Sequence, residues 1–231
     1  MAKALRKYIL CSSQRSGSTL YCRLLKATGV LGAPAEYLAV GKLRDEAPED
    51  TAEALLRTAM ERLGDHATPN GITGAKLHFH QFETFVATVP LASFGGFDLW
   101  VYVDRRDVFA QAVSLARARQ TGQYNSRQDA QGEADYSFER IAGAKRHLDR
   151  DKAGWHAYFE QHGIRPLVVA YEDIVGDPDR AVGMILAEFG ETGARSVSLA
   201  DVRLAVQRTD ESIAWAERFR AEWQQREGGA A

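Results

Sequence analysis

A short stretch near the N-terminus constrains the fold more than any other part of the chain. It begins as an apolar run over residues 8–11, continues as a serine-rich turn, and becomes a helical pattern over residues 20–28. A strand, a turn of small residues and a helix can hold a phosphate-like anion, because turn N–H groups and the positive end of the helix converge on it. Arg15 supplies a fixed charge and Gly17 a flexible point. The stretch therefore predicts an anion-binding loop, and the alternative is an ordinary turn that caps a helix.

The loop lacks the G-x-x-x-x-G-K-S/T pattern of nucleotide triphosphatases. The net charge of −2 argues against general nucleic-acid binding, which requires a basic surface. The apolar runs are far too short for a membrane span, and no apolar segment precedes a cleavage site, so we expect a cytoplasmic protein without a secretory signal. Cys11 and Cys22 fall on a predicted strand and helix, which indicates buried free thiols and neither a disulfide framework nor a metal site.

Apolar segments and segments of helical periodicity alternate along the chain. The predicted strands are residues 6–12, 71–77, 97–103 and 166–170. The predicted helices are residues 18–28, 47–63, 107–120, 136–162 and 181–189, with a helical tail from residue 201. This alternation is typical of parallel sheets. We therefore predict an α/β fold, a three-layer P-loop-like arrangement with a mainly parallel central sheet flanked by helices, in one domain over residues 1–231.

Polar residues directly follow three of these strands. Ligands of open parallel sheets bind at the carboxyl ends of the strands, so the three segments should meet at one edge of the sheet. The segments are Gln14–Thr19, Lys76–His80 and Asp104–Asp107.

Arg105 and Arg106 end the third of these strands, and Ser114 lies about two turns along the following helix on roughly the same side. A guanidinium and a hydroxyl could hold a second anion there. The alternative is a surface ion pair with Asp104 or Asp107. Two separated anion sites would suit a nucleotide with both 5′ and 3′ phosphate groups.

Five motifs in this order carry a resemblance that covers nearly the whole chain. They are Gln14–Thr19, Gly32–Tyr37, Gly74–Leu77, Arg105–Asp107 with Gln111–Ser114, and Tyr171–Asp173. The chain resembles the bacterial trehalose 2-sulfotransferase family, a branch of the sulfotransferases that use 3′-phosphoadenosine 5′-phosphosulfate (PAPS) as the sulfuryl donor.

The resemblance implies a PAPS-dependent sulfotransferase that acts as a homodimer. It implies that the donor's 5′-phosphosulfate is held by Arg15, Ser16, Gly17, Ser18 and Thr19. It implies that the 3′-phosphate is held by Arg105 and Ser114, with Arg106 as an alternative arginine. Related cytosolic sulfotransferases usually carry lysine where Arg15 stands.

Sulfuryl transfer needs in-line positioning and charge stabilisation, by analogy with phosphoryl transfer, and a base for the acceptor hydroxyl. Lys76 could add charge near the bridging oxygen, unless it is a solvent-exposed lysine at a strand end. Glu36 matches the glutamate proposed as base in the trehalose enzyme, and partial desolvation would raise its pKa toward a useful value. His78 is the rival, because Lys76-Leu77-His78 resembles the K-x-H of cytosolic sulfotransferases. We favour Glu36, and expect His80 to be structural or to face the substrate.

The acceptor is expected to be a small sugar or another alcohol. Polar residues of the 120–135 loop, with Tyr37, Phe79 and Phe82, could line its pocket, although core packing is the alternative for the aromatic rings and the favoured one for Phe82. An aromatic stripe in the C-terminal helix is expected to be core as well; it comprises Trp215, Phe219 and Trp223. Two other functions stay open, an ATP-dependent small-molecule kinase and a non-catalytic nucleotide-binding module.

Overall fold

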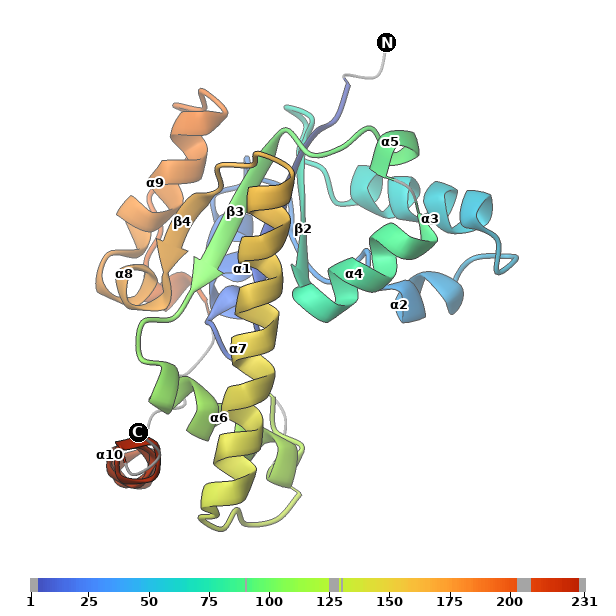
Figure 1. The fold of residues 1–231 in the computed structure, drawn as a ribbon. Coiled ribbons are helices and arrows are strands. Elements are labelled where there is room, and N and C mark those ends of the chain that lie inside the picture. The colour runs from blue at the N-terminus through green and yellow to red at the C-terminus, as the bar shows by residue number, and fades with distance from the viewer. Residues whose placement is uncertain (1–3, 90, 125–128, 130, 203–208, 229–231) are drawn as a thin grey trace. The chain divides into compact units, whose positions relative to one another are not determined.

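Four strands form the centre of the fold in a computed structural model that describes residues 4–89, 91–124, 129, 131–202 and 209–228. The strands are β1 (Arg6–Ser12), β2 (Ile72–His78), β3 (Leu99–Asp104) and β4 (Leu167–Ala170). They form one parallel sheet in the order β2-β1-β3-β4 (Figure 1). All four predicted strands and their parallel arrangement are confirmed.

The chain divides into two compact units, which are described separately. The first comprises Met1–Asp104 and Asp151–Val202, and the second comprises Arg105–Arg150 and Arg203–Ala231. The prediction of a single domain over residues 1–231 stays a prediction.

The strand register places the carboxyl ends of the strands at the same edge of the sheet. Ser12 at the end of β1 is opposite both His78 of β2 and Val103 of β3, and Asp104 is opposite Ala170 of β4. Whatever follows β1 and β2 along the chain therefore begins at neighbouring points. This is the edge at which open parallel sheets bind their ligands.

The first unit also contains a set of helices. They are α1 (Ser18–Ala27), α2 (Val40–Arg44), α3 (Ala52–Asp65), α4 (Phe79–Thr88), α5 (Leu91–Phe94), α8 (Tyr171–Gly176), α9 (Pro178–Glu188), the 3-10 helix η1 (Leu199–Asp201) and the part of α7 (Phe138–Gln161) from Asp151 on. The predicted helix over residues 47–63 begins later, because the Thr51 hydroxyl caps the backbone N–H of Ala54 at 3.2 Å. The short helices α2, α4, α5 and α8 were not predicted.

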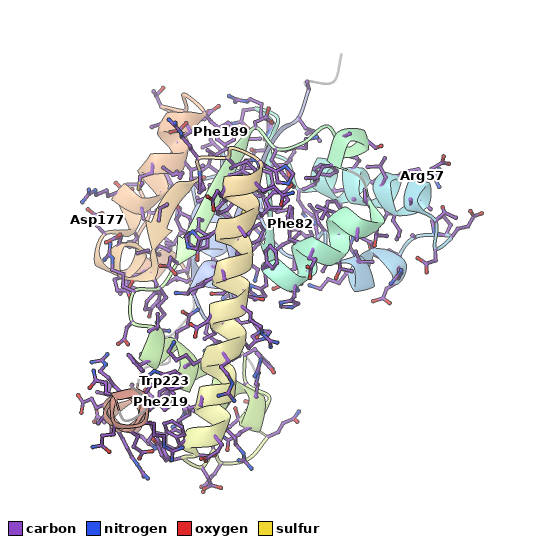
Figure 2. The ribbon with its side chains drawn as sticks, in the orientation of Figure 1. Arg57, Phe82, Asp177, Phe189, Phe219 and Trp223 are labelled. Atoms are coloured by element: carbon purple, nitrogen blue, oxygen red, sulfur yellow. The ribbon has the colours of Figure 1, made fainter. Side chains whose placement is uncertain are left out.

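One face of the sheet carries a large aromatic core. Ile9 and Cys11 of β1 pack there with Phe82 of α4 and Trp155 of α7. The rings of Phe82 and Trp155 are 4.8 Å apart, and Figure 2 shows Phe82 beside α7. The prediction that Phe82 is a core residue is confirmed. Cys11 and Cys22 are both buried free thiols, also as predicted.

Helices α1 and α9 cover the opposite face. Alternate side chains of β1 point to opposite sides of the sheet, so half of them face these helices. Tyr8 points this way, and its ring lies 5.9 Å from that of Phe189 after α9. The Tyr21 hydroxyl of α1 donates to the carbonyl of Ala181 in α9 at 2.6 Å. The first unit therefore has the three layers that the sequence predicted.

The second unit is helical in its described part. It contains α6 (Val108–Thr121), the first half of α7 and α10 (Asp210–Gly228). Phe219 of α10 is fully buried against α6 and α7, with Trp215 and Trp223 packed partly buried against the same cluster, so the core prediction for the aromatic stripe is confirmed (Figure 2). The predicted helical tail also covers 203–208, which lie outside the described residues. No helix in the described part of either unit is long and apolar enough to cross a membrane.

Candidate active site

The loop between β1 and α1 has the backbone of an anion-binding turn. Arg15 and Gly17 both adopt left-handed backbone angles, with φ of 62° and 82°. Gly17 is the residue that directly precedes α1, and as a glycine it has no side chain to cap the helix. Such a turn directs N–H groups toward a common point, where the positive end of the helix dipole also acts.

Gly17 is required for two separate reasons. Its left-handed conformation is unfavourable for residues with a β-carbon. A β-carbon at this position would also lie 2.4 Å from Cδ2 of Tyr171, at the start of α8. The loop is therefore packed closely against the segment that follows β4.

Ser16 supplies a test of whether the loop suits an anionic ligand. The side chain is fully buried, and its hydroxyl oxygen has no hydrogen-bond partner among the described residues. A buried hydroxyl without a partner is costly in a folded protein. An oxygen-rich anion in the loop would satisfy it, so the residues present fit a phosphate or phosphosulfate group.

Lys76 joins this loop to the predicted base. Its ammonium group lies 2.6 Å from Oε1 of Glu36 and 3.4 Å from Oγ1 of Thr19 in the first turn of α1. The Lys76 side chain is only 6% exposed. The alternative of a solvent-exposed strand-end lysine is therefore wrong.

The segment that carries Glu36 is fixed along the edge of β2. The backbone N–H of Lys76 donates to the carbonyl of Ala35 at 2.8 Å, as in a single parallel bridge. Tyr37 braces the same segment: its hydroxyl donates to the carbonyl of Ala33 at 2.6 Å, and its ring stacks on His66 at 4.1 Å. Glu36 is thus held by backbone pairing on one side and ring packing on the other.

Three side chains surround the Glu36 carboxylate. Besides Lys76, the Gln81 amide donates to Oε2 at 3.1 Å, and the Lys42 ammonium lies 3.8 Å from the same oxygen. Burial by itself would raise the pKa of Glu36, but the charge and hydrogen bond of Lys76, with smaller contributions from His78 and Gln81, lower it to about 2. The expectation of a raised pKa is wrong for the donor-free protein, because the Lys76 ammonium and the other partners together outweigh the effect of burial.

His78 ends β2 in a different environment. The side chain is buried, and its Nδ1 lies 3.0 Å from Oγ of Ser12. The Ser12 hydroxyl also donates to the carbonyl of Leu77 at 3.2 Å. Burial, and then the repulsion from Lys76, lower the pKa of His78 to about 3. His78 is therefore uncharged at neutral pH.

The remaining predicted residues of this segment are divided between the surface and the core. His80 is exposed, and its Nδ1 lies 3.3 Å from Oδ2 of the buried Asp151, a hydrogen bond that raises the pKa of His80. Phe79 packs edge-on against Trp155 with ring centres 5.4 Å apart. The ring of Phe79 therefore packs around the core, which was the alternative to its predicted role in the acceptor pocket.

The second predicted anion site belongs to the second unit. Arg105 and Arg106 lie between β3 and α6, and Ser114 lies on α6. Asp107 caps α6 through the N–H of Ala110 at 3.0 Å and pairs with Arg220 of α10 at 3.2 Å. The role of Arg105, Arg106 and Ser114 stays a prediction.

The predicted acceptor loop over residues 120–135 is also in this unit, and residues 125–128 and 130 lie outside the described part. Its two ends are joined by the N–H of Gln131, which donates to the carbonyl of Thr121 at 2.8 Å, and by Asp135, whose N–H donates to Oε1 of Gln120 at 3.1 Å.

Sequence reasoning missed Ser12 and Gln81. Ser12 is the hydroxyl residue that ends an apolar strand, which could have marked it as a partner for a neighbouring polar group. Gln81 follows His78 by three residues, the spacing at which a glutamine side chain binds back to the first residue of a helix. That signal was present, but α4 was not recognised as a helix.

A parallel sheet whose first strand leads through an anion-binding turn into a helix, with a buried lysine and a carboxylate beside the turn, defines a P-loop-like group-transfer protein. Residues 7–222 match the profile of the Stf0 sulphotransferase family, so the chain belongs to this family and is a sulfotransferase. The family prediction is confirmed.

Two curated relatives match over nearly their full length. Trehalose 2-sulfotransferase of Mycobacterium tuberculosis (strain Erdman) is 31% identical over 262 aligned positions, which cover 96% of this chain and 97% of the relative. Trehalose 2-sulfotransferase of Mycolicibacterium smegmatis is 30% identical, with 94% and 95% covered. Among solved structures, the sulfotransferase from Alicyclobacillus acidocaldarius has the same fold, with a TM-score of 0.52, 12% identity, and coverage of 96% of this chain and 95% of that one.

Proposed function

We propose that this protein transfers a sulfuryl group from PAPS to a hydroxyl of a carbohydrate or glycolipid-type acceptor. One observation carries the proposal: the Lys76 ammonium lies between Thr19 of the anion-binding loop and the Glu36 carboxylate. A cation in this position can act on both partners of a transfer reaction, the donor in the loop and the base beside it. The carbohydrate is inferred from the two relatives, which are named as trehalose sulfotransferases.

The donor would be held at two places. The turn from Arg15 to Thr19 would bind the 5′-phosphosulfate, with the buried Ser16 hydroxyl as one of its hydrogen-bond partners. Arg105 or Arg106 with Ser114 would bind the 3′-phosphate. These roles require no metal ion, since the positive charge comes from side chains and from the start of α1.

The transfer itself is an in-line displacement at sulfur. The acceptor oxygen forms a bond to sulfur, the bond between sulfur and the bridging oxygen breaks, and adenosine 3′,5′-bisphosphate leaves with the electron pair. The acceptor proton passes to Glu36, and Lys76 stabilises the negative charge on the departing phosphate.

Lys76 cannot neutralise Glu36 and the donor equally well at the same time. When an anionic donor draws on the same ammonium group, Glu36 loses part of the interaction that lowers its pKa. The carboxylate then becomes a stronger base when the donor is bound. This exchange explains how a residue with a low pKa in the free protein can act as the base.

The nucleotide preference is tested by thermal-shift titration with adenosine 3′,5′-bisphosphate and, separately, with ATP and Mg²⁺. We expect stabilisation by the bisphosphate, by about 2.7 kcal/mol at a concentration 100 times the dissociation constant, and none by ATP with Mg²⁺. Stabilisation by ATP with Mg²⁺ alone would instead indicate a kinase, and no response to either would indicate a non-catalytic module. A screen of disaccharides, glycolipids and simple alcohols with labelled donor would then identify the acceptor. The predicted homodimer and cytoplasmic location stay predictions.

A further inference from the structure

We propose that Gln81 is a positioning residue for this reaction, which holds the Glu36 carboxylate in the orientation that accepts the acceptor's proton. The inference rests on the proposed role of Glu36 as the base. Gln81 lies in the first turn of α4. It contacts Oε2 of Glu36, whereas Lys76 binds the other carboxylate oxygen, Oε1.

The orientation of the Gln81 amide is determined by its two partners. Its Oε1 accepts a hydrogen bond from the backbone N–H of His78 at 2.9 Å, and its Nε2 donates to Glu36 at 3.1 Å. The reverse orientation would place two N–H donors face to face at His78 and two oxygens face to face at Glu36. Gln81 can therefore act only as a donor to Glu36.

Gln81 is itself fixed to a rigid part of the first unit. The helix that carries it begins directly after β2, and the bond to the His78 N–H caps this helix. Phe82 and Phe85, on the same helix, are fully buried in the aromatic core. The amide is thus anchored to the strand end and to the core, and its hydrogen bond fixes the position of the Glu36 carboxylate.

The pH dependence of this arrangement also involves the other titratable groups around Glu36. They come from four elements: Cys22 of α1, Lys42 of α2, Lys76 and His78 of β2, and His80 of α4. Of these, Cys22 stays protonated, since burial raises the pKa of its thiol to about 12. A change at Gln81 alters the interaction with Glu36 while all of these groups stay in place.

Two substitutions separate positioning from folding. Gln81→Glu keeps an oxygen acceptor for the His78 N–H but places a second carboxylate against Glu36, which raises the pKa of the pair. Gln81→Met keeps the approximate length of the side chain and removes both hydrogen bonds. Thr51→Ala is the matched control, because it removes one helix cap in the same unit, from α3, away from the site.

We expect both Gln81 variants to lower kcat about 10-fold to 100-fold, the effect of losing a hydrogen bond to a charged group, with little change in KM for the donor. The acid limb of the plot of kcat/KM against pH should move to higher pH, and further in Gln81→Glu than in Gln81→Met. Thr51→Ala should lower the melting temperature without changing kcat or the acid limb. Gln81 variants that behave like Thr51→Ala in both kinetic measurements would overturn the proposal.

The pKa of Glu36, measured by NMR of the labelled carboxyl carbon, gives a second readout that needs no turnover. The proposal requires this pKa to rise in both Gln81 variants and to stay unchanged in Thr51→Ala; an unchanged pKa in Gln81→Glu would contradict it. The turnover assay, applied to the unmodified protein and to Glu36→Gln, tests the proposed function separately. If the unmodified protein transfers no sulfuryl group, or Glu36→Gln keeps full turnover, the proposed function fails, whereas the carboxyl titration still decides whether Gln81 acts on Glu36.

Discussion

Glu36 and His78 lie on different elements around one ammonium group, and that group acts on them in opposite ways. Lys76 attracts the Glu36 carboxylate and keeps it ionised, with a pKa lowered to about 2 in spite of burial. For His78, burial and the repulsion from Lys76 both disfavour the charged form, and its pKa falls to about 3. At neutral pH one candidate base is an anion and the other an uncharged imidazole.

The two residues also differ in access to a substrate. The Glu36 side chain is 26% exposed, whereas His78 is 8% exposed and its Nδ1 is occupied by Ser12. A base must come within hydrogen-bond distance of the hydroxyl that it deprotonates. A similar shift of pKa can therefore belong to an accessible reactive group or to a buried structural one, and exposure distinguishes the two. It favours Glu36 as the base.

Removal of the shared cation should have the largest effect. We expect Lys76→Met to lower kcat about 100-fold to 1,000-fold, the range for loss of one group that stabilises transition-state charge. Without Lys76, burial would dominate at Glu36 and raise its pKa above the usual range, and the pKa of His78 would also rise. NMR titration of both residues, together with the pH–rate profile, measures these changes.

Lys42→Met is the matched control for Lys76→Met, because this more exposed lysine is 3.8 Å from the same carboxylate. We expect a much smaller change in kcat and in both pKa values. Equal effects of the two substitutions would show that net charge, and not the position of Lys76, determines the behaviour of the site.

The next largest effect should distinguish the two candidate bases directly. We expect Glu36→Gln to lower kcat about 100-fold or more, which is the usual scale for loss of a general base. His78→Asn should lower kcat less than about 10-fold, because an amide can replace Nδ1 as the partner of Ser12. Steady-state kinetics with saturating donor measure both. A large loss in His78→Asn with near-normal turnover in Glu36→Gln would assign the base to His78.

The sequence was sufficient to predict the strands and the anion-binding turn, because both depend on local features. Buried parallel strands are continuous apolar runs, and the turn needs small residues followed by a helix. The burial of Lys76 could not be predicted in this way. It depends on the bridge between Ala35 and Ala75, which brings a distant segment with Glu36 alongside β2.

The error about the Glu36 pKa has the same origin. The sequence indicated a loop carboxylate near a proline, for which desolvation alone raises the pKa. The partner that reverses the shift is 40 residues away along the chain, at Lys76, and no local pattern joins the two. Gln81, by contrast, has a local signal in its three-residue spacing from His78, and the short α4 obscured it.

The stability of the protein toward acid should also distinguish the two residues. His78 has a pKa of about 3 when folded and an ordinary value of 6.5 when unfolded, so the unfolded state binds the proton more readily. Its contribution to stability is therefore complete above about pH 6.5 and is lost as the pH falls toward 3, by about 1.4 kcal/mol for each pH unit within this window. Glu36, with its pKa lowered from 4.5 to about 2, loses its contribution only below about pH 4.5. Urea unfolding at a series of pH values should show the first loss in the unmodified protein and not in His78→Asn, whereas both proteins should show the second. If His78→Asn has the same slope between pH 6 and 5 as the unmodified protein, His78 is not held uncharged by the fold, and the contrast with Glu36 disappears.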